Sequence, residues 1–583
     1  MPNRQAIAVL ATLSAGYLLG LFGSIATYRL VFHPLKGIPG PVGAKLSGFW
    51  SALSSVPSFK FHRQVQDLHQ AYGDFVRIRP REISINNADA IKDIHGPASV
   101  CLKGPFYDHS YPHRSLHTTR DKALHAKRRR VWDKGFSIAA LKEYEPRVRE
   151  HCLDLISQIS TIGERPVEVT KWLNYFTFDV IGDLAFGKPF GMLKNGKSHF
   201  ILHQNEAMKP VIGFLTCTPW LFILFQHLPL ISQKRAEWLR WCASQVIERK
   251  RVGTSRKDLF SHLLGNSMDQ LSSDRDLVYD SELAIAAGSD TTTTTLAATL
   301  FLLAKHPQKQ KLLQEEIDHR IESIEGFSVE KLAGAPILDG CINEALRLYP
   351  PVPSGVQRVT PAEGAVVAGR WLPGNVFVST PTYTIHRDPR NFSNPDQFIP
   401  ERWSSKPELV RRRDAFNPFL TGPFSCAGKV LAMMEMRILL ALLVHSFSFR
   451  FAGKKEGRHQ GIGGDNEPDF RDYFTARFCP FELVFSKRER DGGMAIGLLS
   501  WGFHYVPYQV IQRKAELFHG QSCILEAALP ASMQSNGRFS LLERLCASFG
   551  GTTGTTSTWR TQTIGITVPA VAAGFMGNYG RSG

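Results

Sequence analysis

The pattern of apolar and polar positions begins with one unusually long apolar segment, from Ala6 to Tyr28. It runs for 23 positions without a charged residue. As a helix that rises about 1.5 Å per residue it would be about 34 Å long, enough to cross a bilayer core of about 30 Å. The rival interpretation is a cleaved signal peptide, whose apolar region usually has only about 7–15 residues. We therefore predict that residues 1–30 form a retained transmembrane signal anchor.

A Pro/Gly-rich stretch at residues 31–45 follows the apolar segment. Each proline fixes φ and disfavours helix in the residue before it, so we interpret this stretch as a stiff hinge. Basic residues gather on this side of the segment, at Arg29, Lys36 and Lys45, whereas only Arg4 and the amino terminus precede it. The positive-inside rule then places the rest of the chain in the cytosol.

Beyond the hinge, the periodicity predicts a mainly α protein with a small β region. Alternating apolar positions at 75–79 and 82–86 predict an early β-hairpin. Apolar residues with helical spacing predict helices at about 138–160, 170–187, 234–250, 256–270 and 280–305, the last and longest ended by His306-Pro307.

The final segment, residues 491–583, has a different character. It is rich in Gly, Ser and Thr and includes Gly550-Gly-Thr-Thr-Gly-Thr-Thr-Ser-Thr. Low complexity with few charges favours disorder, or sequence that is not part of the native product. We therefore expect a folded catalytic domain at residues 46–490 and an atypical low-complexity tail after it.

Composition and charge narrow the classes of partner. Apolar residues make up 43% of the chain, which suffices for a large core, and the net charge is +17. That charge suits nucleic acid, an anionic membrane surface or an acidic protein. No basic cluster interleaved with aromatic residues is evident, so we expect no nucleic acid partner. The nine cysteines are scattered without a Cys-x-x-Cys pair, which argues against a disulfide framework or structural zinc and indicates a reducing compartment.

One cysteine occupies a special context. Residues 419–428 read Phe-Leu-Thr-Gly-Pro-Phe-Ser-Cys-Ala-Gly and place Cys426 between Gly422 and Gly428, directly before an apolar helical segment. A thiolate at a helix N-terminus is stabilised by the helix dipole, so its pKa falls and it becomes a better metal ligand. The glycines allow a tight bend and a close approach to a flat object. The alternative is an ordinary buried cysteine at the start of a core helix.

Two polar residues, Asp290 and Thr291, fall in the middle of the longest predicted helix, just after Gly288. A glycine there costs about 1 kcal/mol relative to alanine, so it needs a reason. One reason is an acid–alcohol pair in a pocket beside the helix. The alternative is that Gly288 only relieves packing and that the threonines at 291–295 bond to the backbone.

Two charged pairs have helical spacing. Glu344 and Arg347 are three apart on a helix that a Pro-Pro pair ends, and they are alternatively a surface ion pair of little worth. His125 and Arg129 are four apart on a basic helix and therefore share one face. A basic helix is otherwise simply a solvated face.

Together these motifs resemble those of the cytochrome P450 family. Residues 419–428 are similar to its haem-ligand loop, Glu344-Ala-Leu-Arg347 to its Glu-x-x-Arg pair, Phe398-Ile-Pro-Glu-Arg-Trp403 to the segment that adds a third member, and Ala287-Gly-Ser-Asp-Thr-Thr292 to its oxygen-activation motif. Four matches in order across roughly 140 residues are much more specific than any single one. The resemblance extends from about residue 30 to about 490, and the hinge is similar to that of microsomal members from filamentous fungi.

The resemblance implies the cytochrome P450 fold, with one N-terminal transmembrane helix, and haem b as cofactor. The thiolate of Cys426 would be the axial iron ligand, with Phe419 packed against the sulfur side of the ring. Thr291 would hydrogen-bond the reacting dioxygen and Asp290 would admit protons to it. Glu344, Arg347 and Arg402 would form a buried structural triad.

The haem propionates would be held by His125, Arg129 and Arg358. The sequence departs from the family at Phe424, because the position two before the cysteine often carries Arg or His as a further donor. One propionate contact must therefore be made elsewhere or be lost.

The resemblance also implies function and partners. The expected reaction is the hydroxylation or epoxidation of a hydrophobic small molecule in fungal secondary metabolism, in a pocket lined by residues 103–117, 214–220, 284–287 and 352–356. No flavin or nicotinamide fingerprint is evident, so electrons would come from a separate NADPH–cytochrome P450 reductase, with cytochrome b5 as an optional second donor. The protein would be a single-pass protein of the endoplasmic reticulum membrane. The alternatives are desaturation or ring expansion without net oxygen insertion and, in another class, a non-catalytic haem- or lipid-binding relic.

Overall fold

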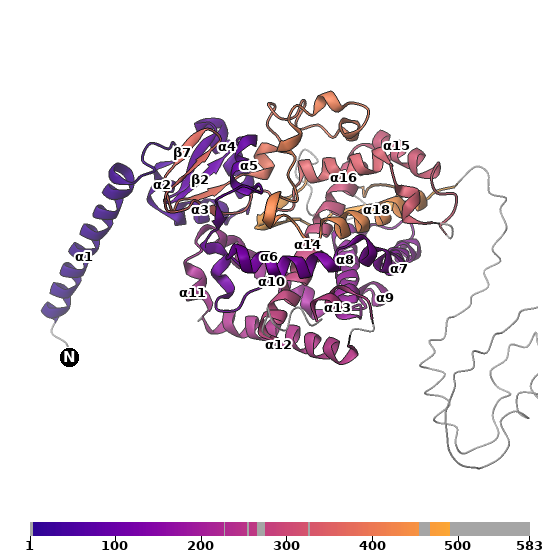
Figure 1. Ribbon diagram of the computed structural model, residues 1–583, viewed down its shortest axis with the longest axis horizontal. Coiled ribbons are helices and arrows are strands. Elements are labelled where there is room, and N and C mark those ends of the chain that lie inside the picture. Colours follow the sequence, from indigo (N-terminus) through magenta and orange to yellow (C-terminus); the bar gives the residue numbers. More distant parts are fainter. Residues whose placement is uncertain are drawn as a thin grey trace, which may run out of the picture. The chain divides into compact units, whose positions relative to one another are not determined.

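The structure is a computed structural model and describes residues 4–226, 228–253, 256–264, 274–324, 327–453 and 467–489 (Figure 1). The predicted tail lies outside the described residues. The helices are α1 Arg4–Thr27, α2 Val42–Leu46, α3 Gly48–Ser55, α4 Phe61–Tyr72, α5 Ala88–His95, α6 Lys122–Gly135, α7 Ile138–Ile162, α8 Val169–Phe186, α9 Met192–Asn195, α10 Phe200–Cys217, α11 Leu221–Gln226, α12 Pro229–Val252, α13 Leu259–Leu263, α14 Asp274–Lys305, α15 Pro307–Asp318, α16 Pro336–Leu348, α17 Thr382–Ile385 and α18 Lys429–Ser446.

The core is built around α14, the longest helix. Every residue from 292 to 304 is buried, so this half of α14 is covered on all sides. It packs against α8, α12, α16 and strand β11. A helix surrounded in this way has no solvent-facing stripe, which explains its run of apolar residues and threonines. α18 is likewise buried from Ile438 to His445.

A five-stranded sheet has the order β1-β2-β8-β5-β3. Its strands are β1 Phe75–Arg79, β2 Glu82–Ile85, β8 Phe377–Ser379, β5 Arg358–Val359 and β3 Leu102–Lys103. β1 and β2 are antiparallel, with Val76 opposite Ser84, which confirms the predicted hairpin. β2 and β8 are parallel, so residues nearly 300 positions apart become neighbours.

The remaining strands form three small sheets. They are β10 Phe470–Tyr473 with β11 Thr475–Phe478, β4 Val167–Glu168 with β12 Glu482–Lys487 and β9 Phe447–Phe451, and β6 Ala365–Val367 with β7 Arg370–Leu372. β11 packs on α14, and this contact brings the β10–β11 turn to the middle of the longest helix.

Four of the five predicted helices are confirmed by α7, α8, α12 and α14. The fifth, predicted at 256–270, is wrong in extent, because α13 covers only Leu259–Leu263 and residues 265–273 lie outside the described residues. Asp258 fixes the start of α13 with a capping box, in which its carboxylate accepts from the backbone N–H of Ser261.

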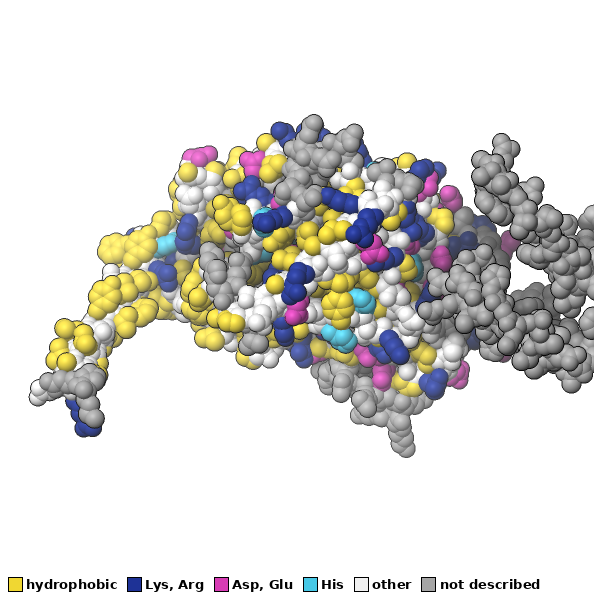
Figure 2. All heavy atoms as spheres, turned by 90° about the horizontal axis from the view of Figure 1, so that it is seen from below, with side chains coloured by type: hydrophobic (Ala, Val, Ile, Leu, Met, Phe, Trp, Pro, Cys, Tyr) yellow, Lys and Arg dark blue, Asp and Glu magenta, His cyan; other side chains and the backbone are white. Residues whose placement is uncertain are grey.

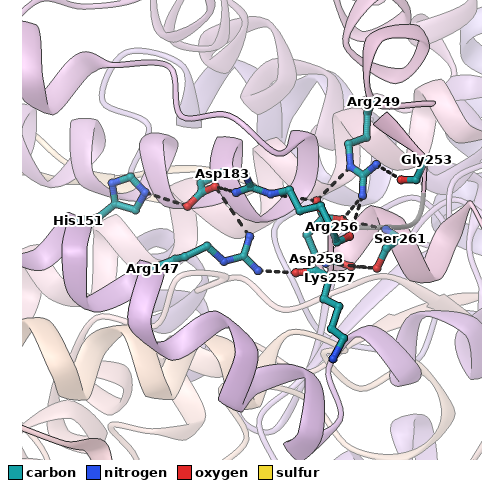
Figure 3. A network of polar contacts seen from close by, with 9 residues as sticks. All are labelled: Arg147, His151, Asp183, Arg249, Gly253, Arg256, Lys257, Asp258 and Ser261. Carbon is teal, nitrogen blue, oxygen red and sulfur yellow. Dashed lines mark hydrogen bonds and ion pairs between the residues drawn. The ribbon is translucent and has the colours of Figure 1, made fainter. Parts of the chain in front are cut away.

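A buried polar network holds α13 in place (Figure 3). Arg249, near the end of α12, makes a bidentate contact with Asp258 at 2.8 and 3.0 Å, and both side chains are fully buried. Arg256 continues the network to Asp183 on α8, which also lies 3.3 Å from His151 on α7. The network therefore connects α7, α8, α12 and the start of α13.

The N-terminal apolar segment is helical from Arg4 and continues as a π-helical turn at Tyr28–Phe32. It has no buried residue up to Thr27, and its apolar side chains face outward (Figure 2). Its length and hydropathy suffice to cross a membrane. The carbonyl of Arg29 accepts from Arg77 Nη1 on β1 at 3.0 Å, so the folded domain begins at this turn.

Candidate active site

The loop before α18 carries Cys426, whose side chain is accessible within the folded domain. Among the other cysteines of the described residues, those at 101, 152, 217, 242 and 341 are buried and Cys479 is half-buried, whereas Cys426 is exposed. Its N–H donates to the Phe419 carbonyl at 2.8 Å, which closes the loop over eight residues. Cys426 is thus not an ordinary core cysteine, although α18 is a core helix.

The pKa of the Cys426 thiol lies above its usual value. Crowding of the sulfur by the loop raises this pKa more than the N–H groups of Gly428 and Lys429 and the charge of Arg129 lower it. The N–H groups at the start of α18 thus lower the pKa of the thiol as expected, but the effect of burial is larger. A coordinated metal ion would be needed to deprotonate the thiol, as it does for other cysteine ligands.

The two glycines of the loop differ in whether their backbone conformation and surroundings would allow a side chain. Gly422 has φ +70° and a Cβ there would stand 2.2 Å from the carbonyl oxygen of His95, so only glycine fits. Gly428 has φ −84°, and a Cβ would have ordinary contact with Phe136 at 3.8 Å. Packing within the protein does not demand glycine at 428, and its expected approach to a flat cofactor stays a prediction.

Glu344, Arg347 and Arg402 meet in the interior. Arg347 donates to both carboxylate oxygens of Glu344 at 2.7 and 2.9 Å, and Arg402 Nε lies 3.0 Å from the same carboxylate. All three side chains are fully buried. A surface ion pair is therefore excluded, and the Glu344 carboxylate accepts two further hydrogen bonds, from Trp403 Nε1 and from the Ile399 N–H.

A chain of contacts connects this triad with the cysteine loop. Arg347 Nη1 donates to the carbonyl of His386 at 3.0 Å, and the His386 Nε2 accepts from the N–H of Asn417 at 3.1 Å. Asn417 lies two residues before Phe419. The triad is thus connected by hydrogen bonds to the start of the cysteine loop. A structural role is what the resemblance implies for it.

Phe424, where a basic donor was expected, stands at the centre of a basic cluster. Lys103 Nζ lies 4.8 Å and the Arg358 guanidinium 5.2 Å from its ring centroid, and the His125 ring is 4.6 Å away. We call Lys103, His125 and Arg358 the basic cluster. Lys103 was not predicted as a donor from the sequence, where it appeared only as part of the substrate loop. The sequence contains little indication of this role, because a single lysine on a two-residue strand has no second basic residue at a regular spacing.

The basic cluster is buried and short of negative charge. Within the described parts of the chain, neither Lys103 nor Arg358 has an ion pair, and Arg358 Nε has no hydrogen-bond partner. Burial and then the neighbouring cations lower the pKa of Lys103 well below its usual value and that of His125 to about 3. Such a cluster fits a ligand with more than one carboxylate, as the two propionates of haem would supply.

Arg129 has a different environment from the one expected. Its Nη1 donates to the carbonyl of Ser425 at 2.5 Å, and its Nε donates to Asp133 at 2.6 Å. It therefore supports the backbone next to Cys426. The neighbouring Arg128 is fully buried and pairs with Asp280 at 2.6 Å. Arg129 as a propionate donor stays a prediction.

Asp290 and Thr291 lie on α14 and have separate partners. Thr291 donates to the Ala287 carbonyl at 2.8 Å, and a Cβ at Gly288 would stand 2.9 Å from Ile181 on α8. Both features of the packing alternative are thus present. They do not exclude the catalytic interpretation, because the threonine hydroxyl also remains a hydrogen-bond acceptor.

The carboxylate of Asp290 is bound by α10. Lys209 Nζ lies 3.2 Å and Asn205 Nδ2 3.0 Å from Asp290 Oδ1, and the aspartate side chain is only 6% exposed. Lys209 also pairs with Glu206 at 2.7 Å, and Glu206 in turn pairs with Arg477 on β11. The sequence analysis missed Lys209, which lies 81 positions before Asp290.

The predicted substrate segments meet only in part. Phe106, Cys217 and Ser354, from three of the four segments, line a common cavity, and the segment at 284–287 does not reach it. Three residues of that cavity, Arg79, Glu82 and Asp472, come from strands to which the sequence analysis gave no role.

The sequence is similar to those of known proteins over most of its length. The sequence profile described as "Cytochrome P450" matches residues 39–461. Cytochrome P450 monooxygenase nodW of Hypoxylon pulicicidum is 45% identical over 473 residues, which cover 81% of this chain and 86% of the relative. Cytochrome P450 monooxygenase orf5 of Eupenicillium brefeldianum is 41% identical over 82% of this chain and 96% of the relative. Tryprostatin B 6-hydroxylase of Aspergillus fumigatus is 37% identical over 76% and 80%, respectively.

A solved structure shows the same fold. The crystal structure of the cytochrome P450DA haem domain superposes with a TM-score of 0.62 and covers 75% of this chain and 94% of that domain. Its sequence identity is 19%, so this likeness concerns the fold alone.

Proposed function

This chain belongs to the cytochrome P450 family, and we propose on that premise that it oxidises a hydrophobic small molecule in fungal secondary metabolism by inserting one oxygen atom. Membership of this family makes the chain a haem monooxygenase. The chain matches fungal cytochrome P450 monooxygenases over most of their length. A hydroxylase among them, tryprostatin B 6-hydroxylase, supports hydroxylation as the reaction type.

The observation that carries the proposal is the pairing of an exposed cysteine loop with a buried basic cluster. Cys426 would bind the iron of haem b, and Lys103, His125 and Arg358 would bind its propionates. Haem so held supplies the activation of dioxygen. The role of the protein would then be to keep the thiolate bound and shielded; Phe419 would contribute its ring, and its carbonyl accepts from the Cys426 N–H.

Proton supply would fall to α14. Thr291 presents its hydroxyl one turn after Ala287, and Asp290 is the nearest acid on the same helix. Because Asp290 is held by Lys209 and Asn205, protons would pass through this hydrogen-bonded group rather than through open solvent.

Electrons would come from NADPH through a separate cytochrome P450 reductase, with cytochrome b5 as an optional second donor. The net charge of +17 suits an acidic partner surface. The apolar α1 supports an anchor in the endoplasmic reticulum membrane with a cytosolic catalytic domain.

The test has two stages. Microsomes that contain the full chain should show the red-shifted Soret band of the reduced carbon monoxide complex, and Cys426→Ala should abolish it. Retention of that band in the variant would refute Cys426 as the ligand. Metabolite profiling after disruption of the gene should then reveal the accumulated precursor.

Incubation of that precursor with the chain, reductase and NADPH should yield a product heavier by one oxygen atom. Loss of two hydrogen atoms would instead establish desaturation, and an unchanged mass would indicate ring rearrangement. Absence of any substrate-dependent NADPH oxidation would favour the non-catalytic relic.

A further inference from the structure

A cavity of about 50 Å³ lies where the five-stranded sheet, α10 and the β10–β11 turn meet. Its polar lining comes mainly from Arg79, Glu82, Ser354, Gln357 and Asp472. A cavity of this size accommodates a small polar group of a larger molecule, since a single water needs roughly 10–15 Å³.

One wall of the cavity belongs to the β10–β11 turn, which is attached to α14. The rings of Phe106 and Phe474, which line the cavity, are 4.8 Å apart, and Phe474 lies at the tip of the β10–β11 turn. That turn is fixed to α14, because Thr294 donates to the Ala476 carbonyl at 2.7 Å. Thr294 lies three positions, just under one helical turn, after Thr291. The turn therefore joins this wall of the cavity to the stretch of α14 that carries Thr291.

Asp472 is the distinctive residue of the cavity. It is 6% exposed; Ser354 Oγ donates to one carboxylate oxygen at 2.5 Å and the Phe474 N–H to the other at 3.1 Å. Within the described residues it has no ion pair. Burial raises its pKa to about 6, so the carboxylate is still mostly ionised at neutral pH. Each oxygen retains capacity for a further donor.

The charges around the cavity do not balance. Arg79 is paired with Glu82 at 2.6 Å, and Glu82 also accepts from Gln357 at 3.1 Å, so this cation is already matched. The cavity lining therefore contains two carboxylates, those of Glu82 and Asp472, and one cation, Arg79. Aromatic faces next to a surplus carboxylate are the combination that attracts nitrogen cations and N–H groups.

We propose that this cavity is a polar subsite of the substrate pocket and that Asp472 binds a nitrogen hydrogen-bond donor of the substrate. That donor is a protonated amine or a neutral N–H group, and the contact orients the substrate against Thr291. The inference rests on the proposed function, because it assigns a substrate class to the same enzyme.

Three probes of matched shape test the subsite on the haem-loaded full chain. They are 3-phenylpropylguanidinium, a cationic donor; 3-phenylpropylurea, a neutral donor; and (5-methylhexyl)benzene, a hydrocarbon of similar outline. Soret titration gives each dissociation constant without any turnover. At least one nitrogen probe should bind more tightly than the hydrocarbon, and the choice between guanidinium and urea identifies the charged or the neutral donor.

Substitution then locates the contact. Asp472→Asn should weaken the preferred nitrogen probe about tenfold, the loss expected for one charged hydrogen bond, and leave the hydrocarbon unchanged. Asp469→Asn is the matched control, because Asp469 is partly exposed, pairs with Arg471 and Lys60, and does not line the cavity.

Two results would overturn the inference. One is a parent protein that binds the hydrocarbon as tightly as both nitrogen probes, which needs no variant at all. The other is an Asp472→Asn protein with an intact carbon monoxide band and an unchanged preference. Either outcome leaves the monooxygenase proposal standing, because that proposal is tested by turnover.

Discussion

Phe424 is the residue at which the site departs from the family motif that the loop resembles, and its surroundings compensate for the missing donor. The aromatic ring offers no hydrogen bond, but its face attracts the cations of Lys103 and Arg358. The ring thereby gives these two buried basic side chains a common contact, although Arg358 still lowers the pKa of Lys103. We infer that the donor lost at 424 is replaced by Lys103.

Substitution of the basic cluster should weaken haem binding. Lys103→Met and Arg358→Met each remove one charged hydrogen bond to a propionate, worth about 1.5–3 kcal/mol. Transfer of haem to apomyoglobin should therefore be roughly ten- to a hundredfold faster in either variant. Arg370→Met is a suitable control, since this arginine is exposed on β7. Equal transfer rates in all three variants would place the propionates elsewhere.

Lys209 should control coupling rather than binding. Lys209→Met leaves the Asp290 carboxylate without its cation, so proton supply to the reaction should become less efficient. We expect the ratio of product to NADPH consumed to fall severalfold while peroxide rises, with little change in substrate affinity. Lys311→Met is the control variant, because Lys311 is exposed on α15. Unchanged coupling would restrict Lys209 to a structural role.

At the scale of elements, buried polar contacts decide where some helices begin and which helices touch. α13 is the clearest case, because five residues alone cannot sustain a helix. Its start depends on the carboxylate of Asp258, which at the same time neutralises Arg249 at the end of α12. One side chain thus serves a cap and an ion pair.

Loss of this carboxylate should be costly. Asp258→Ala removes the cap and leaves Arg249 buried without its partner, which should lower the free energy of unfolding by about 3–5 kcal/mol. Asp258→Asn keeps the cap acceptor and should lie between the parent and the alanine variant. Urea unfolding followed by circular dichroism measures the order. An alanine variant as stable as the asparagine variant would contradict the double role.

Glu435 gives α18 a dependence on pH. Burial raises the pKa of Glu435 to about 8, so the folded protein keeps a proton that the unfolded chain loses near pH 4.3. Between these two values the folded state binds more protons, and the contribution of Glu435 to stability falls as pH rises. The urea midpoint of the parent should therefore drop more between pH 6 and pH 8 than that of Glu435→Gln. Parallel midpoints would show that Glu435 ionises normally.

At the scale of the whole molecule, the apolar helix α1 and the folded domain meet at one turn. Arg77 on β1 is fully buried and donates to the carbonyls of Arg29 and Pro80. Arg29 in turn donates to the carbonyl of Leu46. The turn at Tyr28–Phe32 therefore belongs to the domain by its contacts, although its sequence continues the apolar segment.

Two truncations test this boundary. A chain that starts at Tyr28 should lose integral membrane association but keep its haem and its thermal stability. A chain that starts at His33 also loses the acceptor of Arg77, so its unfolding temperature should be several degrees lower. Equal unfolding temperatures would move the boundary to the hinge, and membrane association after alkaline carbonate washing of both would refute α1 as the anchor.

The sequence by itself determined the features that depend on neighbours in the chain. The β1–β2 hairpin follows from alternation in two runs of five residues, and α7, α8, α12 and α14 follow from helical periodicity. The order of the four motifs was sufficient to indicate the family, because a ligand loop such as 419–428 must carry its chemistry within one short segment. Local backbone preferences and side-chain spacing are encoded locally, so they can be read locally.

The tertiary structure decided which residues share a site. Lys209 meets Asp290, Lys103 meets Arg358, and Asp472 meets Ser354 only because helices and strands far apart in the chain pack together. None of these pairs has a periodic signal, since the energy of a buried charge depends on burial and on the partner's position in space. The same reason explains why the extent of α13 and the balance of pKa effects at Cys426 were not predictable from the sequence.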